Sequence, residues 1–198
     1  KWNIIKLARL RAKKGEQRGM EVLVVVDMQN DFVSGNLGTK EAVAIVPNVK
    51  KKIEEYSTNG DVIYFTKDAH WDGYLDTQEG KKLPVEHCVI GTNGWEIVDE
   101  LKSYAKHVIN KDRFGSNDLA ECIHGGFASN DYDSVELVGV CTDICIVSNA
   151  LLIKAWVPEM EITVDASCCS GVTPEKHRAA LEVMKSCQIN VIGEKSYD

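Results

Sequence analysis

Short runs of Val, Ile and Leu recur along this chain, and segments with helical spacing separate them. The clearest run is Val22–Val26, where five apolar residues follow one another without the alternation of a half-exposed strand. Apolar strands that alternate with helices predict a parallel sheet whose two faces are both covered. We therefore expect an α/β fold with one six-stranded parallel sheet.

The apolar and helical patterns assign most of the chain to elements. Strands are expected at residues 22–26, 62–66, 107–110, 134–138, 161–164 and 189–192. Helices are expected at residues 41–56, 95–104, 117–123, 143–156 and 174–186. The short helix at 117–123 should be followed by a break at Gly125 and Gly126. Residues 72–93 are polar and predict a long loop, and loops of that length are often functional.

The charge is unevenly distributed along the 198 residues. The net charge is −7, yet residues 1–19 hold seven basic residues and one acid. We divide the chain into a basic N-terminal extension, 1–19, and a single domain, 20–198. Two interpretations of the extension remain open: a basic amphipathic helix that contacts a membrane surface or another subunit, and a plain extension, which the position of Met20 favours.

Composition also excludes several classes of partner and site. The acidic domain argues against nucleic acid, and no stretch approaches the roughly 20 apolar residues of a membrane helix. Seven cysteines is an odd number, and residues 4–10 are too charged for a secretory signal. We expect reduced thiols and a cytoplasmic protein. The Cys and His spacing matches no zinc finger or zinc ribbon.

Chemically reactive residues follow the expected strands. Ligands of open parallel sheets bind beyond the carboxyl ends of the strands, so these residues should lie along one edge. The polar start of a loop explains any one of them better than a functional role does, but a carboxylate, an amine and a thiol together form a nucleophilic set. The residues concerned are Asp27, Lys67, Asp68, His70, Lys111, Cys141, Cys145 and Asp165.

The segment 138–145 predicts a strand, a tight turn and a helix. Thr142 is a plausible N-cap, which would put Cys145 in the first helical turn, exposed and stabilised as a thiolate by free N–H groups. The same N–H groups could receive an oxyanion. The alternative is a buried cysteine that acts as a small hydrophobe, which suits Cys122, Cys141 and Cys187 better. A Cys141–Cys145 redox pair also stays open, although the spacing is not C-x-x-C.

Asp27 and Lys111 are the expected partners of this thiol. Asp27 follows a buried run, and burial raises the pKa of a carboxylic acid while a nearby lysine opposes the rise. Such a group can accept the thiol proton and later deliver it to a leaving amine. The alternatives are a structural cap for Asp27 and a solvated surface charge for Lys111.

A second group of residues has the composition of a metal site. Asp68 and His70 face the same way in an extended segment, and His87 follows at the far end of the polar loop. Two histidines and one carboxylate can hold a metal with open positions, with Glu79 as a possible fourth ligand or an outer partner. A surface loop with two incidental histidines is the competing interpretation.

Five motifs together resemble the isochorismatase-like cysteine hydrolases, and most closely their metal-dependent nicotinamidase/pyrazinamidase branch. The motifs are VVVDMQNDF (24–32), Asp68-Ala-His70, HCVIGTNGWE (87–96), NKDRFGS (110–116) and GVCTDICI (139–146). They cover nearly the whole domain. The resemblance implies a three-layer αβα sandwich around the six-stranded sheet, often assembled as a dimer or tetramer.

The resemblance also implies roles for the candidate residues. Cys145 would be the nucleophile, Asp27 the general base and acid, and Lys111 the group that positions both. The Val140–Cys141 peptide bond would be cis, so that the Cys141 and Cys145 amides form the oxyanion hole. Asp68, His70 and His87 would hold zinc, iron or manganese, with zinc favoured, and Phe32 would lie against the substrate.

The expected activity is hydrolysis of nicotinamide to nicotinic acid and ammonia by a cysteine amidohydrolase. The family often has an aromatic residue three positions before His87, where this chain has Pro84 with Leu83 beside it. That difference affects which amide the protein would prefer more than it affects whether the protein hydrolyses amides. Two rivals remain: hydrolysis of another small amide, a ureido compound or a vinyl ether, and a catalytically silent protein that binds a ligand or assembles with a partner.

Overall fold

A computed structural model describes residues 19–194, and these contain one six-stranded sheet. Every strand pair is parallel, and the order is β3-β2-β1-β4-β5-β6. The order reverses between β1 and β4, and ligands of open α/β sheets bind beside such a switch point. The strands are β1 Met20–Val26, β2 Val62–Asp68, β3 His107–Lys111, β4 Tyr132–Val140, β5 Glu161–Ser170 and β6 Asn190–Ile192.

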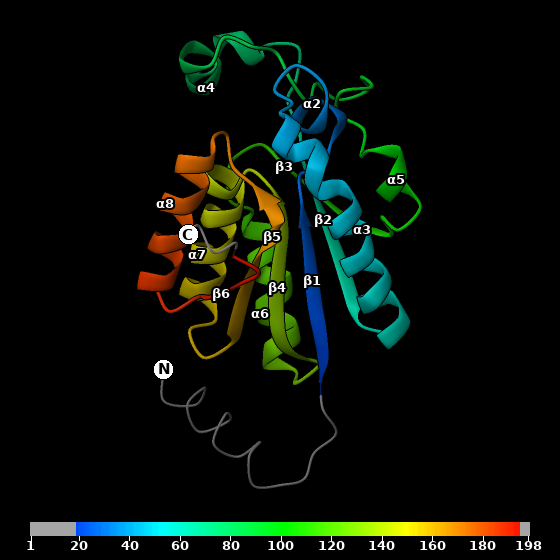
Figure 1. The fold of residues 1–198 in the computed structure, drawn as a ribbon, viewed down its shortest axis with the longest axis vertical. Helices are drawn as coiled ribbons and strands as arrows, with labels where there is room; N and C mark the ends of the chain where they lie inside the picture. Colours follow the sequence, from blue (N-terminus) through cyan, green and yellow to red (C-terminus); the bar gives the residue numbers. More distant parts are fainter. Residues whose placement is uncertain (1–18, 195–198) are drawn as a thin grey trace, which may run out of the picture.

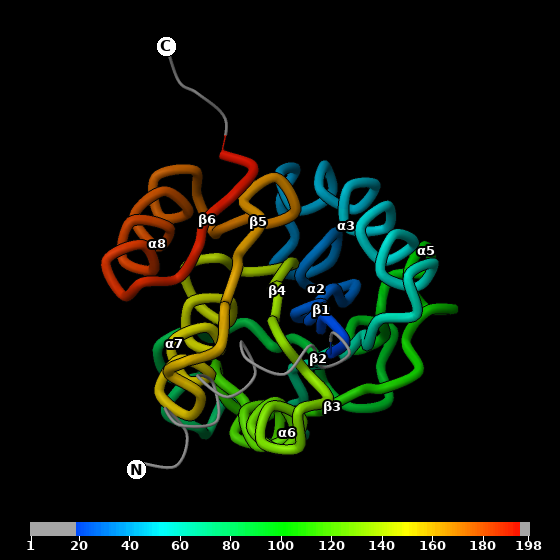
Figure 2. The backbone as a smooth tube through the Cα atoms, turned by 90° about the horizontal axis from the view of Figure 1, so that it is seen from below, coloured from blue at the N-terminus to red at the C-terminus, as the bar shows by residue number. Residues whose placement is uncertain are grey.

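Helices cover both faces of this sheet, which confirms the three-layer αβα architecture. Two of them, α3 and α5, lie on one side, and α6, α7 and α8 lie on the other (Figure 2). Their bounds are α3 Lys40–Asn59, α5 Asp99–Lys102, α6 Asn117–Ala128, α7 Val147–Trp156 and α8 Pro174–Ser186. No helix of the described residues is long and apolar enough to cross a membrane.

The central strand β1 explains why both faces need a cover. Residues Val22–Val26 have no solvent exposure, and alternate side chains enter two separate cores. Leu23 and Val25 pack toward α3, whereas Val24 and its neighbours two positions away pack toward α6 and α7. A strand buried on both faces has no polar side to alternate, so its sequence is continuously apolar.

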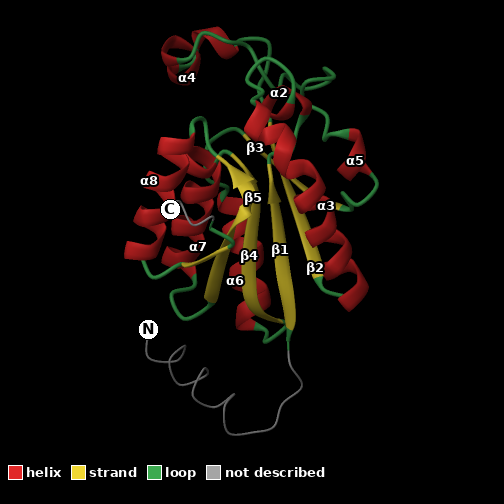
Figure 3. Ribbon diagram, viewed as in Figure 1, coloured by secondary structure: helices red, strands yellow, loops and turns green. Residues whose placement is uncertain are grey.

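The carboxyl ends of the strands lie together at one end of the molecule (Figure 1). Three short helices of the connecting segments gather above them: α2 Asn30–Val33, η1 Tyr74–Asp76 and α4 Gln78–Lys82 (Figure 3). The Thr77 hydroxyl accepts a hydrogen bond from the Gly80 amide and begins α4. The polar segment expected to be a plain loop therefore contains helical turns, and one of them carries Glu79.

Several expected boundaries were wrong. The helix expected at 95–104 is limited to α5, because Ile97 instead forms a bridge with Gln29. α6 continues through Gly125 and Gly126 to Ala128, and a side chain on Gly126 would collide with the Tyr132 ring. That glycine therefore permits close packing rather than a break. The proposed extension falls almost wholly outside the described residues, so it stays a prediction.

Candidate active site

Three side chains that follow or end β1, β3 and β4 meet at the carboxyl edge of the sheet. Lys111 Nζ lies 2.7 Å from Asp27 Oδ2 and 3.4 Å from Cys145 Sγ. Asp27 follows β1, Lys111 ends β3, and Cys145 lies beyond β4. The expected carboxylate, amine and thiol are thus brought together by the topology of the sheet.

Asp27 is completely buried, and a sharp backbone turn and a hydrogen bond from β2 fix its position. Its φ of 50° is left-handed, so the chain turns sharply where β1 ends. The Thr66 hydroxyl donates a 2.7 Å hydrogen bond to Asp27 Oδ1. Burial raises the pKa of the Asp27 carboxyl, and the Lys111 charge opposes this rise without cancelling it. A carboxylate poised in this way can accept and return a proton.

Lys111 is the cation that the buried carboxylates share. Burial would lower the pKa of its ammonium group, but Asp27, Cys145 and Asp68 raise the pKa well above its usual value. Lys111 is therefore charged at neutral pH. The contact with Asp68, 3.3 Å from Nζ to Oδ1, connects Lys111 to the donor cluster described below.

The expected exposure of Cys145 was wrong, because the residue is only 5% exposed. Burial raises the pKa of its thiol well above the usual value, Asp27 adds to the rise, and Lys111 opposes it. The resting group is therefore a thiol, and Asp27 accepts its hydrogen bond. A thiol in this state needs a base before it can act as a nucleophile, and Asp27 is in position to be that base.

The turn that carries Cys145 also differs from the expected α-helical start. Residues Thr142–Ile146 form a π-helical turn, and the Thr142 hydroxyl contacts His177 Nδ1 at 2.8 Å instead of capping. The Val140–Cys141 peptide bond is cis, as the resemblance implied. The Cys141 carbonyl accepts hydrogen bonds from the amides of Ile144 and Ile146, and the Cys145 amide between them is not one of its donors.

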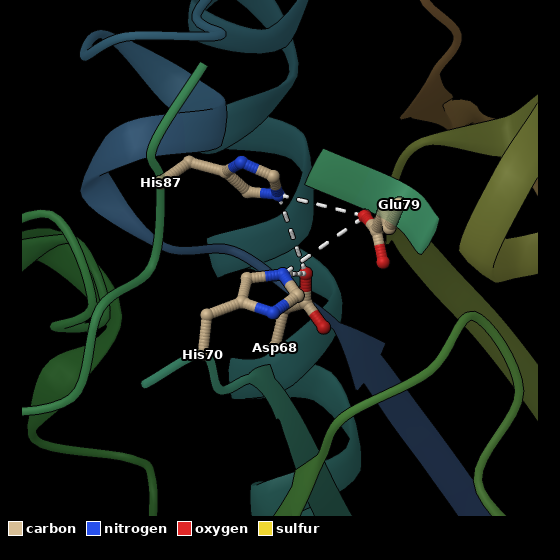
Figure 4. A group of neighbouring side chains, drawn as sticks. All are labelled: Asp68, His70, Glu79 and His87. Atoms are coloured by element: carbon tan, nitrogen blue, oxygen red, sulfur yellow. Dashed lines mark hydrogen bonds and ion pairs between the residues drawn. The ribbon is translucent and has the colours of Figure 1, made fainter. Parts of the chain in front are cut away.

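Four possible metal ligands gather beside this site (Figure 4). Donor atoms of Asp68, His70, Glu79 and His87 all lie within 4.8 Å of one another. His70 Nε2 lies 3.0 Å from Asp68 Oδ2, and His87 Nε2 lies 3.6 Å from the same oxygen. Both nitrogens are 3.9 Å from Glu79 Oε1. Asp68 and His70 lie at and just after the end of β2, Glu79 in α4 and His87 in the segment after α4, so the structure brings together the four residues predicted as a metal site.

The donor set fits a divalent transition metal. Ligands about 2.1 Å from a tetrahedral zinc lie about 3.4 Å apart, within the span of the observed distances. His87 Nδ1 lies 2.8 Å from the Val85 carbonyl oxygen, which can only accept. Nδ1 therefore carries a proton, and Nε2 is the nitrogen left for a ligand. Imidazoles with carboxylates suit zinc, iron and manganese.

A cavity of about 720 Å³ opens onto Cys145 and onto the four possible metal ligands. Cys145 and Cys141 line one part of its wall, and the four possible metal ligands line another. Phe32 also lines this cavity, with its ring centroid 5.4 Å from that of His87. Leu83, next to Pro84 at the position of the family's aromatic residue, also lines the cavity.

Comparison with known proteins identifies the family. The model of the isochorismatase domain matches residues 21–196. The chain belongs to the isochorismatase family. Nicotinamidase of Schizosaccharomyces pombe is 27% identical, over 87% of this chain and 93% of the relative.

Two solved structures show the same architecture as this isochorismatase-family chain. The pyrazinamidase of Pyrococcus horikoshii in complex with zinc has a TM-score of 0.75 and 31% identity, over 88% of this chain and 99% of the other. The N-carbamoylsarcosine amidase of Thermoplasma acidophilum has a TM-score of 0.72 and 25% identity, over 90% and 99%. Together these relatives support a hydrolase of carbon–nitrogen amide bonds.

Two residues expected at the site of this family member lie elsewhere. Lys67 points away from Asp68, its neighbour in β2, and its Nζ lies 3.0 Å from the centroid of the Trp95 ring. Asp165 lies inside β5, which runs six residues further than expected, to Ser170. There Asp165 Oδ2 pairs with Lys52 at 2.9 Å. Lys67 was misplaced because successive residues of a strand face opposite sides of the sheet. Asp165 was misplaced because the predicted strand was too short.

The expected burial of the other cysteines was also wrong. Cys122 and Cys187 are exposed and Cys141 is partly exposed, whereas Cys145 is buried. Two contributors to the site were missed. Thr66 binds Asp27, and the Tyr74 ring packs against His70 and His87 with centroids 4.6 and 4.9 Å away. The sequence could have indicated Thr66, because it is a polar residue near the end of an apolar strand. No sequence feature pointed to Tyr74.

Proposed function

We propose that this protein is a cysteine amidohydrolase that converts nicotinamide and water to nicotinic acid and ammonia. The observation that carries the proposal is one cavity lined both by Cys145 and by the Asp68, His70 and His87 donors. A nucleophile next to a site for a ring nitrogen suits an amide attached to a pyridine. The names of the relatives from S. pombe and P. horikoshii support the same class of substrate.

The first half of the reaction forms a thioester. Asp27 accepts the thiol proton as Cys145 Sγ attacks the amide carbonyl carbon, and Lys111 stabilises the negative charge as it passes from the carboxylate to the sulfur. The carbonyl oxygen becomes an oxyanion that accepts hydrogen bonds from the Cys141 and Cys145 amides. Each such donor contributes about 3 kcal/mol. The tetrahedral intermediate then expels ammonia, which leaves with the proton from Asp27.

The second half releases the acid. Asp27 accepts a proton from water, whose oxygen attacks the thioester carbonyl carbon in the same oxyanion hole. The carbon–sulfur bond breaks, the Cys145 sulfur recovers a proton from Asp27, and nicotinic acid leaves. One water is consumed and one ammonia is released, so Asp27 and Cys145 return to their starting states.

The residues Asp68, His70 and His87 would hold the metal, with Glu79 as a further ligand or an outer partner. When bound, the metal supplies a Lewis acid that anchors and polarises the pyridine nitrogen. Phe32 lies next to His87 and would pack against the substrate ring. These residues therefore orient the substrate, while Cys145 and Asp27 carry out the bond changes.

A second candidate is hydrolysis of a larger or differently shaped amide in the same site. The cavity volume lies in the range of pockets for drug-sized ligands, which exceed nicotinamide. Leu83 supplies less ring-stacking surface than an aromatic residue would. The N-carbamoylsarcosine amidase relative has the same fold, which makes ureido compounds a natural part of the substrate panel.

Ammonia release from nicotinamide tests the proposal, with a panel of other small amides and ureido compounds in parallel. We expect release by the wild type and none above background by Cys145→Ala. Release from another amide but not from nicotinamide would favour the second candidate. No release from any compound by metal-loaded protein would favour a catalytically silent binding protein.

A further inference from the structure

The motif at residues 24–32 supplies Asp27 and Phe32 to the site, but Gln29 and Asp31, which lie between them, have no catalytic role in the proposed reaction. Gln29 is completely buried, and Asp31 is 9% exposed. Neither side chain faces the reacting groups. Both instead form hydrogen bonds with the backbone of segments that carry the possible metal ligands.

Gln29 completes the sheet where β1 ends too early. The last pair between β1 and β2 joins Val26 to Thr66, yet β2 continues to Asp68. Beyond that pair, Asp68 has no β1 residue opposite it. The Gln29 side chain takes that place: its Oε1 accepts from the Asp68 amide at 2.7 Å, and its Nε2 donates to the Asp68 carbonyl at 2.9 Å.

The second Nε2 hydrogen of Gln29 is also used. It donates to the Trp95 carbonyl at 2.9 Å, which ties the loop after His87 to the same point. A primary amide has two donors and one carbonyl acceptor, and here all of them have partners. A glutamate side chain would place its oxygens against two carbonyl oxygens, and an apolar side chain would remove one hydrogen-bond partner from each of three backbone groups.

Asp31 forms a similar hydrogen bond with the backbone of the segment that carries His87. Its Oδ2 accepts a 2.8 Å hydrogen bond from the amide of Cys88, the residue directly after His87. Cys88 has a φ of 48°, which non-glycine residues rarely adopt. A side chain on Gly94 would collide with the Asp31 carboxylate, so the loop is shaped around this contact.

We propose that Gln29 and Asp31 are positioning residues of the metal centre. Gln29 fixes the backbone of Asp68, and Asp31 fixes the backbone beside His87, so that donors from two distant segments stay within ligand distance of one another. This inference rests on the proposed metal site. Outer partners of metal ligands typically change metal affinity by about tenfold to a hundredfold when they are removed.

Metal affinity of the purified protein, measured by competition with a chelating dye for zinc and for manganese, tests this role without any assay of activity. We expect Gln29→Met and Gln29→Glu to weaken binding about tenfold or more. Asp31→Leu should have a similar effect, whereas Asp31→Asn keeps an acceptor for the Cys88 amide and should stay within a few-fold of wild type.

Asn149→Ala is the matched control. Asn149 is also a completely buried amide with three backbone partners, the Ser116 amide and the carbonyls of Phe114 and Cys145, but it touches no metal-ligand segment. We expect it to lower the unfolding temperature of the metal-free protein and to leave metal affinity unchanged.

The outcomes distinguish an error in the positioning role from an error in the proposed metal site. If wild type binds neither metal, the metal centre itself is wrong. If wild type binds but the Gln29 and Asp31→Leu variants bind equally well, or Asn149→Ala weakens binding as much, the positioning role is wrong. Should Gln29→Met not fold, Gln29→Glu and the two Asp31 variants decide the question.

Discussion

The Asp68 carboxylate lies between two groups of residues, and its Oδ1 is 3.3 Å from Lys111 Nζ. Its other oxygen, Oδ2, faces the two histidines of the metal-ligand cluster. Burial alone would raise the pKa of Asp68, but hydrogen bonds with His70 and His87 and the Lys111 charge hold it below its usual range. One ionised carboxylate therefore lies between the Lys111 ammonium group and the two histidines of the possible metal site.

Removal of Lys111 should damage stability and catalysis together. Lys111→Met leaves the buried carboxylates of Asp27 and Asp68 without their shared cation. Breaking a buried ion pair by removal of one partner costs about 3 to 5 kcal/mol. We expect a loss of that size in urea unfolding of the metal-free protein, and at least about a hundredfold lower kcat.

Lys102→Met is the control for that variant. Lys102 pairs with Glu96 at 3.2 Å, and its side chain is 55% exposed. Exposed ion pairs contribute at most about 1 kcal/mol, so stability and activity should hardly change. Equal losses from the two lysine variants would mean that burial of the Lys111 cluster has no special importance.

The pH dependence of kcat/KM should report Asp27. This carboxyl must be ionised to accept the Cys145 proton, so the rate falls as acidification protonates it. Because burial raises the pKa of Asp27, the acid limb should lie above the usual Asp value of about 4. The Thr66 hydroxyl lowers that pKa, so Thr66→Val should move the limb to higher pH. An unmoved limb in that variant would assign it to another group.

Glu79 should be the weakest of the four metal donors. It comes from the five-residue helix α4, and its side chain is 24% exposed, compared with 2% for His87. We expect His87→Ala to weaken zinc binding far more than Glu79→Gln, which should lose about tenfold or less. Glu86→Gln, an exposed carboxylate next to His87, is the control. A larger loss from Glu79→Gln than from His87→Ala would contradict this ranking.

The parallel sheet and the meeting of Asp27, Lys111 and Cys145 could be predicted from the sequence because both follow from strand ends. Apolar runs mark the strands, and parallel strands bring their carboxyl ends to one edge. The same logic misplaced Asp165, since β5 continues past it through Ser167, Cys168 and Cys169 as far as Ser170. Small and polar residues there concealed the strand.

Burial and local helical geometry were less predictable. The π-helical turn at Cys145 depends on contacts with β4 and α8, including the Thr142–His177 hydrogen bond, and no local signal encodes it. The bridging role of Gln29 likewise depends on β2 running past the end of β1 by two residues. Such differences in strand length come from the assembled sheet, so a single sequence does not reveal them.

A second buried charge network, away from the site, gives a prediction for stability. Lys52 Nζ lies 2.9 Å from both Glu136 Oε1 and Asp165 Oδ2 beneath α3. Burial would raise the pKa of Asp165, but hydrogen bonds from Ser167 and Lys52 lower it below its usual value. The folded pKa lies below the unfolded one, so this stabilisation is complete above about pH 4 and is lost as the pH falls through the folded pKa.

Lys52→Met should therefore destabilise the protein most at neutral pH. The two carboxylates lose their cation, at a cost of about 1 to 3 kcal/mol in urea unfolding at pH 7. The difference in unfolding free energy from wild type should shrink below pH 4, because protonated Asp165 is neutral and no longer forms an ion pair. Lys51→Met, an exposed change on the same helix, controls for the loss of a positive charge. A difference of the same size at both pH values would instead assign the effect of Lys52 to packing of its hydrocarbon stem, with the ion pairs contributing nothing.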